Sequence, residues 1–393
     1  MSASTSSIVG IRTATWAGFT HDIFRGVLQF MRLHEPWLIQ TPLDSTDELE
    51  PVRINRFWKG DGLIAFRLTK AEIRAFRRRG TALVSISGES FREGIPVVVP
   101  DFEESGRLVA RHFLGLGLRH FAYWGDQSRR YSLARGRGFV EVLEASGHEC
   151  FQIGTEFGQL GAKEERWKNL RRRMLPQLET LPHPIGIFAK DDIAAATLIN
   201  ACQHLGYRVP DDVAIAGPNN DEIFCYTTSP PLTAVRYPGE AIGYRAAEVL
   251  HRLMIEKKTD VPGETLIPVD GLAERESTDV LHIADPVVAE AVRRIRRDAG
   301  CYPLQVNELV ADCQLSRAAF KRRFVLATGH PPKVEIKRVR LANLKDLLLR
   351  TAWPVKKVAE HMRFESVEDL GRFMRRETGQ TATAYRSELK LEV

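Results

Sequence analysis

Several features that would place a protein in a class at once are scarce or missing from this chain of 393 residues. It has only five cysteines, and they are widely separated: Cys150, Cys202, Cys225, Cys301 and Cys313. None belongs to a CxxC pair or to a cluster with histidine, which argues against structural zinc and a disulfide framework. We therefore expect a reduced, cytosolic protein that holds no metal.

Long apolar runs are also missing. No segment approaches the roughly 20 apolar residues that span a bilayer, and the first ten residues lack the basic start and apolar stretch of a secretory signal. The adjacent carboxylates of Asp191 and Asp192 point in different directions, so we expect helix capping there rather than acid–base chemistry. The sequence thus predicts no membrane insertion, no cofactor and no enzyme.

Positive charge is concentrated in the last part of the chain. Residues 285–393 contain 22 Lys and Arg against 14 Asp and Glu, whereas residues 1–284 contain 34 against 36. Lysine and arginine displace counterions from phosphates, so a basic tail favours contact with nucleic acid. Charge alone is equally consistent with a solvated helix surface.

The preceding residues, 1–280, alternate short β-branched runs with amphipathic stretches. This pattern is typical of parallel sheets covered by helices, and it predicts an α/β fold of two successive doubly wound lobes. Residues 266–284 have no helical pattern and predict a connection to the tail. Asp285 and Pro286 then predict the N-cap and first turn of a helix that reaches about residue 299.

One pattern occurs twice in the tail with constant spacing. Ser316, Phe320, Arg322, Phe324, Thr328 and Gly329 recur 50 residues later as Ser366, Leu370, Arg372, Met374, Thr378 and Gly379. Each copy predicts a helix-turn-helix, at about 306–326 and 355–376, within an all-α domain over 285–393. Between them, residues 333–349 predict a helix of roughly 25 Å, which can set two reading helices about one duplex turn (~34 Å) apart.

The outward faces of the two reading helices carry the candidate DNA contacts, which are Arg317, Ala318, Lys321, Arg322, Val367, Glu368, Arg372, Arg375 and Arg376. Arg322 and Arg372 occupy equivalent positions in the repeat and suit bidentate bonding to guanine, and Glu368 suits a cytosine amino group. Arg375 and Arg376, near the helix end, suit phosphate. The alternative interpretation is a pair of ordinary helical hairpins with basic outer faces.

Three segments of the tail carry a family resemblance: SRAAFKRRF, ATGHPPK with RVRLANLKDLL, and VAEHMRFESVEDLGRFMRRETGQTATAYR. Through them residues 290–388 resemble the DNA-binding domain of AraC/XylS-type transcriptional activators. The resemblance implies contact with RNA polymerase and base-facing positions at Ala318, Lys321, Arg322, Val367, Glu368 and Arg372. Arg363 and Ala382 stand where the family usually has glycine and proline. Gly371 lies within the second reading helix and weakens it by about 1 kcal/mol relative to alanine.

The part before the tail resembles the LacI/GalR and periplasmic sugar-binding fold over about residues 8–275. The resemblance is carried by GDGLIAF, IPVVVPDFEESGRLVARHFLGLGLRHFAYWGD, RGRGF, IGIFAKDDIAAATLINACQHLGYRVPDDVAIAGPNND and SPPLTAVRYPGEAIGYRAAEVL. A sensor of this kind joined to an AraC-type tail resembles bacterial regulators of pentose metabolism.

The resemblance places sugar contacts at Arg135, Asp192 and Asn219. Asp192 and Asn219 also follow predicted strands, where open sheets bind ligands. Trp16 suits stacking on a sugar ring, and Arg67 lies at another strand end. Four of these residues have an ordinary alternative: a helix cap for Asp192, a turn for Asn219, packing for Trp16 and a local ion pair for Arg135.

Together these features predict a cytoplasmic, sugar-responsive, sequence-specific transcriptional regulator. We expect an activator of carbohydrate metabolism genes, responding to a pentose such as xylose or a related sugar. The expected partners are operator half-sites in duplex DNA, a monosaccharide effector, a second copy of the chain and RNA polymerase. The alternatives are a sugar-binding protein or sugar-acting enzyme with a basic assembly tail, or a repressor that responds to a nonsugar ligand.

Overall fold

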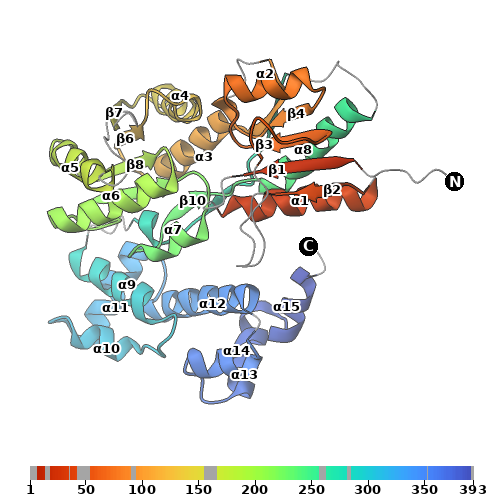
Figure 1. Cartoon of the computed structure of the whole chain (residues 1–393). Coiled ribbons are helices and arrows are strands. Elements are labelled where there is room, and N and C mark those ends of the chain that lie inside the picture. The colour runs from red at the N-terminus through yellow and green to blue at the C-terminus, as the bar shows by residue number, and fades with distance from the viewer. Residues whose placement is uncertain are drawn as a thin grey trace. The chain divides into compact units, whose positions relative to one another are not determined.

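The computed structural model describes residues 7–13, 18–34, 36–41, 54–89, 94–154, 166–255, 263–280, 285–351 and 353–390. The chain divides into two compact units, Met1–Val280 and Leu281–Val393 (Figure 1). The first unit is α/β and the second is helical, which confirms the predicted fold class. No helix among the described residues is long and apolar enough to cross a membrane.

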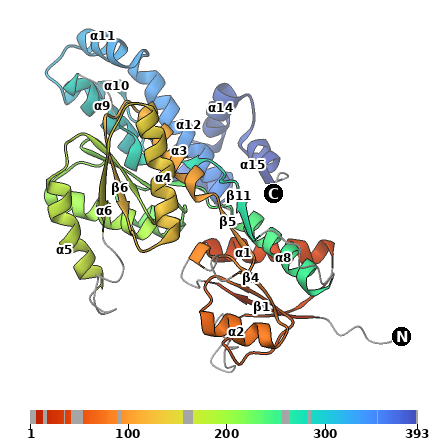
Figure 2. The same ribbon diagram turned by 90° about the horizontal axis from the view of Figure 1, so that it is seen from above.

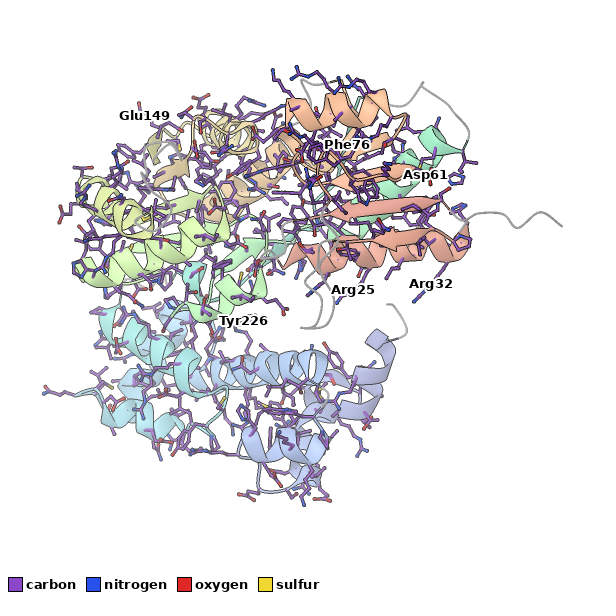
Figure 3. The ribbon with its side chains drawn as sticks, in the orientation of Figure 1. Arg25, Arg32, Asp61, Phe76, Glu149 and Tyr226 are labelled. Carbon is purple, nitrogen blue, oxygen red and sulfur yellow. The ribbon has the colours of Figure 1, made fainter. Side chains whose placement is uncertain are left out.

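The first lobe of the α/β unit is built on a sheet in the order β11-β5-β4-β3-β1-β2. Its parallel strands are β1 (Ile8–Arg12), β2 (Leu38–Gln40), β3 (Gly62–Ala65), β4 (Ala82–Ser85), β5 (Val97–Pro100) and β11 (Glu264–Ile267). The helices of this lobe are α1 (Phe19–Leu33), α2 (Lys70–Arg78) and α8 (Gly239–Met254). Phe76 of α2 is fully buried against this sheet, among apolar side chains that include Leu63 and Leu83 (Figure 3).

The second lobe repeats this order as β12-β10-β9-β8-β6-β7. Its strands are β6 (His120–Gly125), β7 (Cys150–Gly154), β8 (Ile185–Ala189), β9 (Val213–Gly217), β10 (Thr233–Val235) and β12 (Leu272–Ala273), of which only β12 runs antiparallel. Its helices are α3 (Phe102–Gly115), α4 (Arg130–Ala145), α5 (Arg166–Glu179), α6 (Asp192–Leu205) and α7 (Glu222–Thr227), followed by a short 3-10 turn, Glu276–Thr278.

The lobes are interleaved along the chain, so the prediction of two successive lobes is wrong in that respect. The chain leaves the first lobe after β5, returns to it as α8 and β11, and ends in the second lobe with β12 (Figure 2). Residues 266–280 are therefore part of the α/β unit and not a linker, because β11 and β12 complete the two sheets. Residues 281–284 lie outside the described part of the chain.

Close helix packing fixes the position of α4, which carries Arg135. A Cβ added at Gly106 of α3 would lie 2.1 Å from the backbone oxygen of Arg135. A Cβ at Gly138 of α4 would lie 2.0 Å from the backbone oxygen of Glu103. Since real Cβ atoms never approach backbone so closely, glycine at both positions allows the two helices to touch.

The second unit consists of α9 (Pro286–Asp298), α10 (Val306–Ala311), α11 (Arg317–Thr328), α12 (Pro332–Arg350), α13 (Val355–His361), α14 (Val367–Thr378) and α15 (Ala382–Lys390). Asp285 caps α9 by accepting from the N–H groups of Val287 and Val288, and Pro286 occupies its first turn, as predicted. Arg323 of α11 also donates to Asp285, at 2.7 Å from Nη2 to Oδ1. This pair connects α11 to the start of the unit.

The two halves of this unit share α12. Ile336 and Val339 of α12 pack into the core of the first helix-turn-helix, whereas Leu344 and Leu348 pack into the core of the second. Val334, near the start of α12, is 47% exposed. The helix therefore contributes apolar side chains to two separate cores.

Candidate ligand cleft and DNA-reading surface

A cavity in the α/β unit is lined from both lobes at the carboxyl ends of their strands. Its lining consists of Phe19, Phe66, Arg67, Ile86, Ser87, Phe102, Tyr131, Arg135, Asp191, Asp192, Ile193, Asn219, Asp221, Phe224 and Tyr237. It encloses about 790 Å³ of empty space, including its open mouth. Open parallel sheets bind ligands at this edge, because the loops that follow neighbouring strands converge there.

Arg135, Asn219 and Asp192 form a hydrogen-bonded chain in this cavity. Arg135 donates from Nη2 to Asn219 Oδ1 at 2.8 Å and from Nη1 to the backbone oxygen of Lys190 at 2.6 Å. Arg135 is 3% exposed, and its Nε has no hydrogen-bond partner among the described residues. Neither acceptor is a carboxylate, so the predicted alternative of a local ion pair for Arg135 has no support among the described residues.

Asp192 holds the loop after β9 rather than capping its helix. Its Oδ1 accepts from the N–H of Asn219 at 3.1 Å and its Oδ2 from the N–H of Asp221 at 2.8 Å. Burial raises the pKa of this carboxyl to about 7, although both hydrogen bonds and the nearby charge of Arg135 favour its ionised form.

The pKa of the neighbouring Asp191 is shifted in the opposite direction, downward. Asp191 caps α6 by accepting from the N–H of Ala194 at 2.8 Å, and Lys190 Nζ lies 2.6 Å from its Oδ2. Burial by itself would raise the pKa of Asp191, but the charge and hydrogen bond of Lys190 hold that pKa below its usual value. The capping role predicted for the carboxylate pair therefore belongs to Asp191 alone.

Aromatic side chains that the sequence analysis missed form the walls of the cavity. Phe19 and Tyr237 stack with their ring centroids 4.6 Å apart, and Phe19 lies 5.9 Å from Phe66. The guanidinium carbon of Arg135 lies 5.1 Å from the ring centroid of Phe102 and 5.5 Å from that of Tyr131. Aromatic faces around a few fixed polar groups can bind the C–H surface and the hydroxyls of a sugar.

Of the two remaining predicted ligand residues, Arg67 is part of the described structure and Trp16 is not. The exposed Arg67 lines the cavity, and its guanidinium carbon lies 5.1 Å from the ring centroid of Phe66. Trp16 lies outside the described residues. Phe66 and Tyr237 follow the ends of β3 and β10, so the rule that identified Asn219 would also have identified them.

A hydrogen bond joins the two lobes beside the cavity. Asp221, which caps α7 in the second lobe, accepts from the N–H of Gly18 at the start of α1 in the first lobe, at 2.8 Å. Asp221 was not predicted from the sequence, because its partner lies 203 positions away.

The two reading helices, α11 and α14, match in length and in both end structures. Ser316 accepts from the N–H of Ala319, and Ser366 accepts from the N–H of Asp369. Each helix ends at a left-handed glycine, Gly329 with φ 78° and Gly379 with φ 77°. Both helices therefore have the same bounds once the offset of the repeat is applied.

All nine predicted DNA contacts are exposed in the helical unit. Arg372 forms an ion pair with Asp369 at 3.1 Å, and Arg376 one with Glu377 at 2.8 Å. Hydrogen bonds from its own backbone and from Ser366 hold the pKa of Glu368 below its usual value. This surface meets the requirement that base-reading side chains be free to enter a groove.

No group of three or more metal-ligating side chains is present within the residues that the structure describes. The polar groups that line the cavity are carboxylate, amide and guanidinium groups. The helical unit has a basic surface.

Comparison with known proteins assigns a domain to each unit. Residues 110–278 match the periplasmic binding protein-like domain, and residues 309–388 match a helix-turn-helix domain. These matches agree with the predicted sensor and DNA-binding parts, and they include both halves of the repeat.

Several relatives match this chain over most of its length. The xylose operon regulatory protein of Escherichia coli K12 is 27% identical over 359 residues, covering 89% of both chains. The protein of the same name from Haemophilus influenzae is 25% identical over 334 residues, covering 83% of this chain and 84% of its own. The solved structure of the xylose-binding transcription activator xylR has a TM-score of 0.74 at 23% identity and covers 98% of both chains.

Proposed function

We propose that this chain binds a monosaccharide and that the bound sugar changes its affinity for a specific DNA sequence. The chain is a transcriptional regulator that joins a periplasmic binding protein-like sensor to a helix-turn-helix domain. One observation carries the proposal. The chain that presents two matching reading helices also has a cavity with a fixed Arg–Asn–Asp chain between aromatic walls.

The cavity supports a sugar as the effector. Arg135 and Asn219 offer donors and an acceptor to ring hydroxyls, and Asp192 orients Asn219 through its backbone. Phe19 and Tyr237 offer aromatic faces to the C–H side of the ring. Arg67 lies at the cavity wall as a further donor.

The effector is a pentose in this proposal, with xylose as the first candidate. The support is that the relatives matched over most of the chain are regulators of xylose operons. A thermal-shift screen of pentoses and hexoses tests this, because a ligand that binds only the folded chain raises its melting temperature. Stabilisation by hexoses alone would contradict the pentose assignment.

Sugar binding acts on the DNA-binding part through closure of the lobes. A ligand that touches both lobes favours the form in which they are close, and the Asp221–Gly18 hydrogen bond belongs to such a form.

The chain acts as a homodimer, whose closed sensors present the tails to repeated half-sites. It activates transcription through contact with RNA polymerase, as its resemblance to AraC/XylS activators implies.

The experiment is a gel-shift titration with the full chain, with and without each sugar. The two DNA probes are the segment upstream of the gene that encodes this chain and a duplex of random sequence. We expect sequence-selective binding whose affinity changes with a pentose. Absence of selective binding under every sugar would refute the proposal. Conversion of a sugar to a product without any DNA binding would favour the sugar-acting enzyme instead.

A further inference from the structure

Arg363 has a backbone conformation that an arginine rarely adopts. It follows α13 in the turn of the second helix-turn-helix, with φ 51°. Among the non-glycine residues that the structure describes, only Asn220 shares a positive φ. Glycine would adopt this conformation without steric cost, so the arginine side chain is kept at the expense of backbone strain. Strain of this kind points to a use for the side chain.

Arg363 lines a cavity of the helical unit that lies between the two reading helices. The cavity extends from Arg317, the first residue of α11, to Asp369 in the first turn of α14. Its charged lining is mainly basic and consists of Arg317, Lys333, Lys337, Arg340 and Arg363 against Glu365 and Asp369. A nucleic-acid backbone that passes from one reading helix to the other would meet this excess of positive charge.

A buried guanidinium in the same lining has an unused donor. Arg340 is 8% exposed and donates from Nη2 to the backbone oxygen of Met362 at 2.8 Å. Its Nη1 has no hydrogen-bond partner among the described residues. A buried charged donor without an acceptor is costly, and an anion in the cavity would supply a compensating charge beside it.

Two of the charged groups that share this lining with Arg363 pair with side chains outside it. Lys337 pairs with Glu377 at 3.2 Å, and Asp369 pairs with Arg372 at 3.1 Å. The Arg363 guanidinium carbon lies 5.7 Å from the ring centroid of Tyr302, which belongs to the first half of the unit. This contact positions the guanidinium between the two halves without using its hydrogen-bond donors.

We propose that Arg363, with Arg317 and Lys333, binds a backbone phosphate of the DNA segment between the two major grooves. This inference rests on the proposed function, since it assumes that both reading helices dock on one duplex. The contact sets the spacing of the two helices on DNA and carries no base preference of its own.

The test is the salt dependence of DNA binding by the full chain, measured by fluorescence anisotropy on both upstream and random duplexes. The variants are Arg363→Gly and Arg363→Asn, since both residues tolerate a positive φ. The matched control is Lys59→Gln, which removes one exposed positive charge from the other unit. Thermal melting with and without inorganic phosphate accompanies each variant.

We expect both Arg363 variants to bind the two duplexes several-fold more weakly and to lose roughly 0.9 from the slope of log K against log salt, the value for one phosphate contact. Their melting temperatures should equal or exceed that of the wild type, because the backbone strain is relieved. The Lys59→Gln variant should keep the wild-type slope.

Unchanged slopes in both Arg363 variants would overturn the inference and leave the regulator function standing. A wild-type chain that binds no duplex at any salt would overturn both. Stabilisation by inorganic phosphate without any effect of the variants on DNA binding would assign the cavity to a free anion, against the proposal. If Arg363→Gly fails to fold, Arg363→Asn decides the outcome.

Discussion

Asp191 and Asp192 are neighbours in sequence, yet the pKa values of their carboxyl groups are shifted in opposite directions. Lys190 keeps the pKa of Asp191 low, whereas burial raises the pKa of Asp192 to about 7. The sequence placed both at a strand end, which was enough to predict a site. It did not predict which of the two caps the helix, because that depends on where the loop after β9 lies.

The raised pKa of Asp192 predicts a pH dependence of stability. Between about pH 4 and pH 7 the folded chain holds a proton that the unfolded chain has released, so the contribution of this group to the free energy of unfolding falls as pH rises. Above about pH 7 that contribution becomes constant. Urea unfolding of the wild type and Asp192→Asn at several pH values measures it.

The Asp192→Asn variant carries an amide that does not titrate and has one oxygen for the two N–H groups that Asp192 accepts. The stability of the wild type relative to this variant should therefore fall as pH rises from about 4 to about 7, and it should stay constant above about pH 7. A difference that grows as pH rises would show that burial does not control this carboxyl.

Arg135→Ala should abolish sugar binding while leaving DNA binding without sugar intact. The substitution removes the donors to Asn219 and to the Lys190 carbonyl, and it removes positive charge near Asp192. We expect an affinity loss of at least about a hundredfold, equivalent to about 2.7 kcal/mol, in calorimetric titration with the best pentose. Retained affinity in a folded variant would exclude Arg135 from the ligand site.

The reading helices give a prediction for individual arginines. Arg322→Ala and Arg372→Ala should each cost about 1–3 kcal/mol on the cognate sequence and relax base preference at one position. Arg376→Ala should weaken cognate and random DNA alike, since a phosphate contact carries no sequence information. Binding assays on a panel of single-base operator variants separate the two patterns, and equal losses on all DNA for all three would remove the base-reading assignment.

At the scale of elements, the repeat in the tail was the most predictable part of the chain. Capping serines, apolar positions and terminal glycines are local signals, and α11 and α14 begin and end at equivalent positions. The interleaving of the lobes was not predictable in the same way. β11 and β12 are short, and their assignment to different sheets depends on partners far away in sequence.

Two glycines in helices should respond in opposite ways to alanine. A Cβ at Gly371 in α14 would meet nothing within 4 Å, so Gly371→Ala should stabilise the helical unit by up to about 1 kcal/mol. A Cβ at Gly106 would meet the backbone of Arg135, so Gly106→Ala should separate α3 from α4 and weaken sugar binding. Thermal melting and sugar titration of both variants test this, and destabilisation by Gly371→Ala would contradict it.

At the scale of the whole molecule, the cavity and the reading surface occur in separate compact units of one chain. Neither unit by itself distinguishes a regulator from a sugar-binding protein or from a DNA-binding protein without an effector. The proposed function needs a coupling between them, in which a ligand shifts the population of closed sensors and, by linkage, DNA shifts the affinity for the ligand.

The most direct test of that coupling is the affinity of the full chain for its upstream DNA, measured with and without a saturating pentose. We expect sequence-selective binding that changes at least about fivefold with the sugar, equivalent to a coupling free energy of about 1 kcal/mol, and no change in the Arg135→Ala variant. Equal affinity with and without a sugar that demonstrably binds the sensor would contradict it.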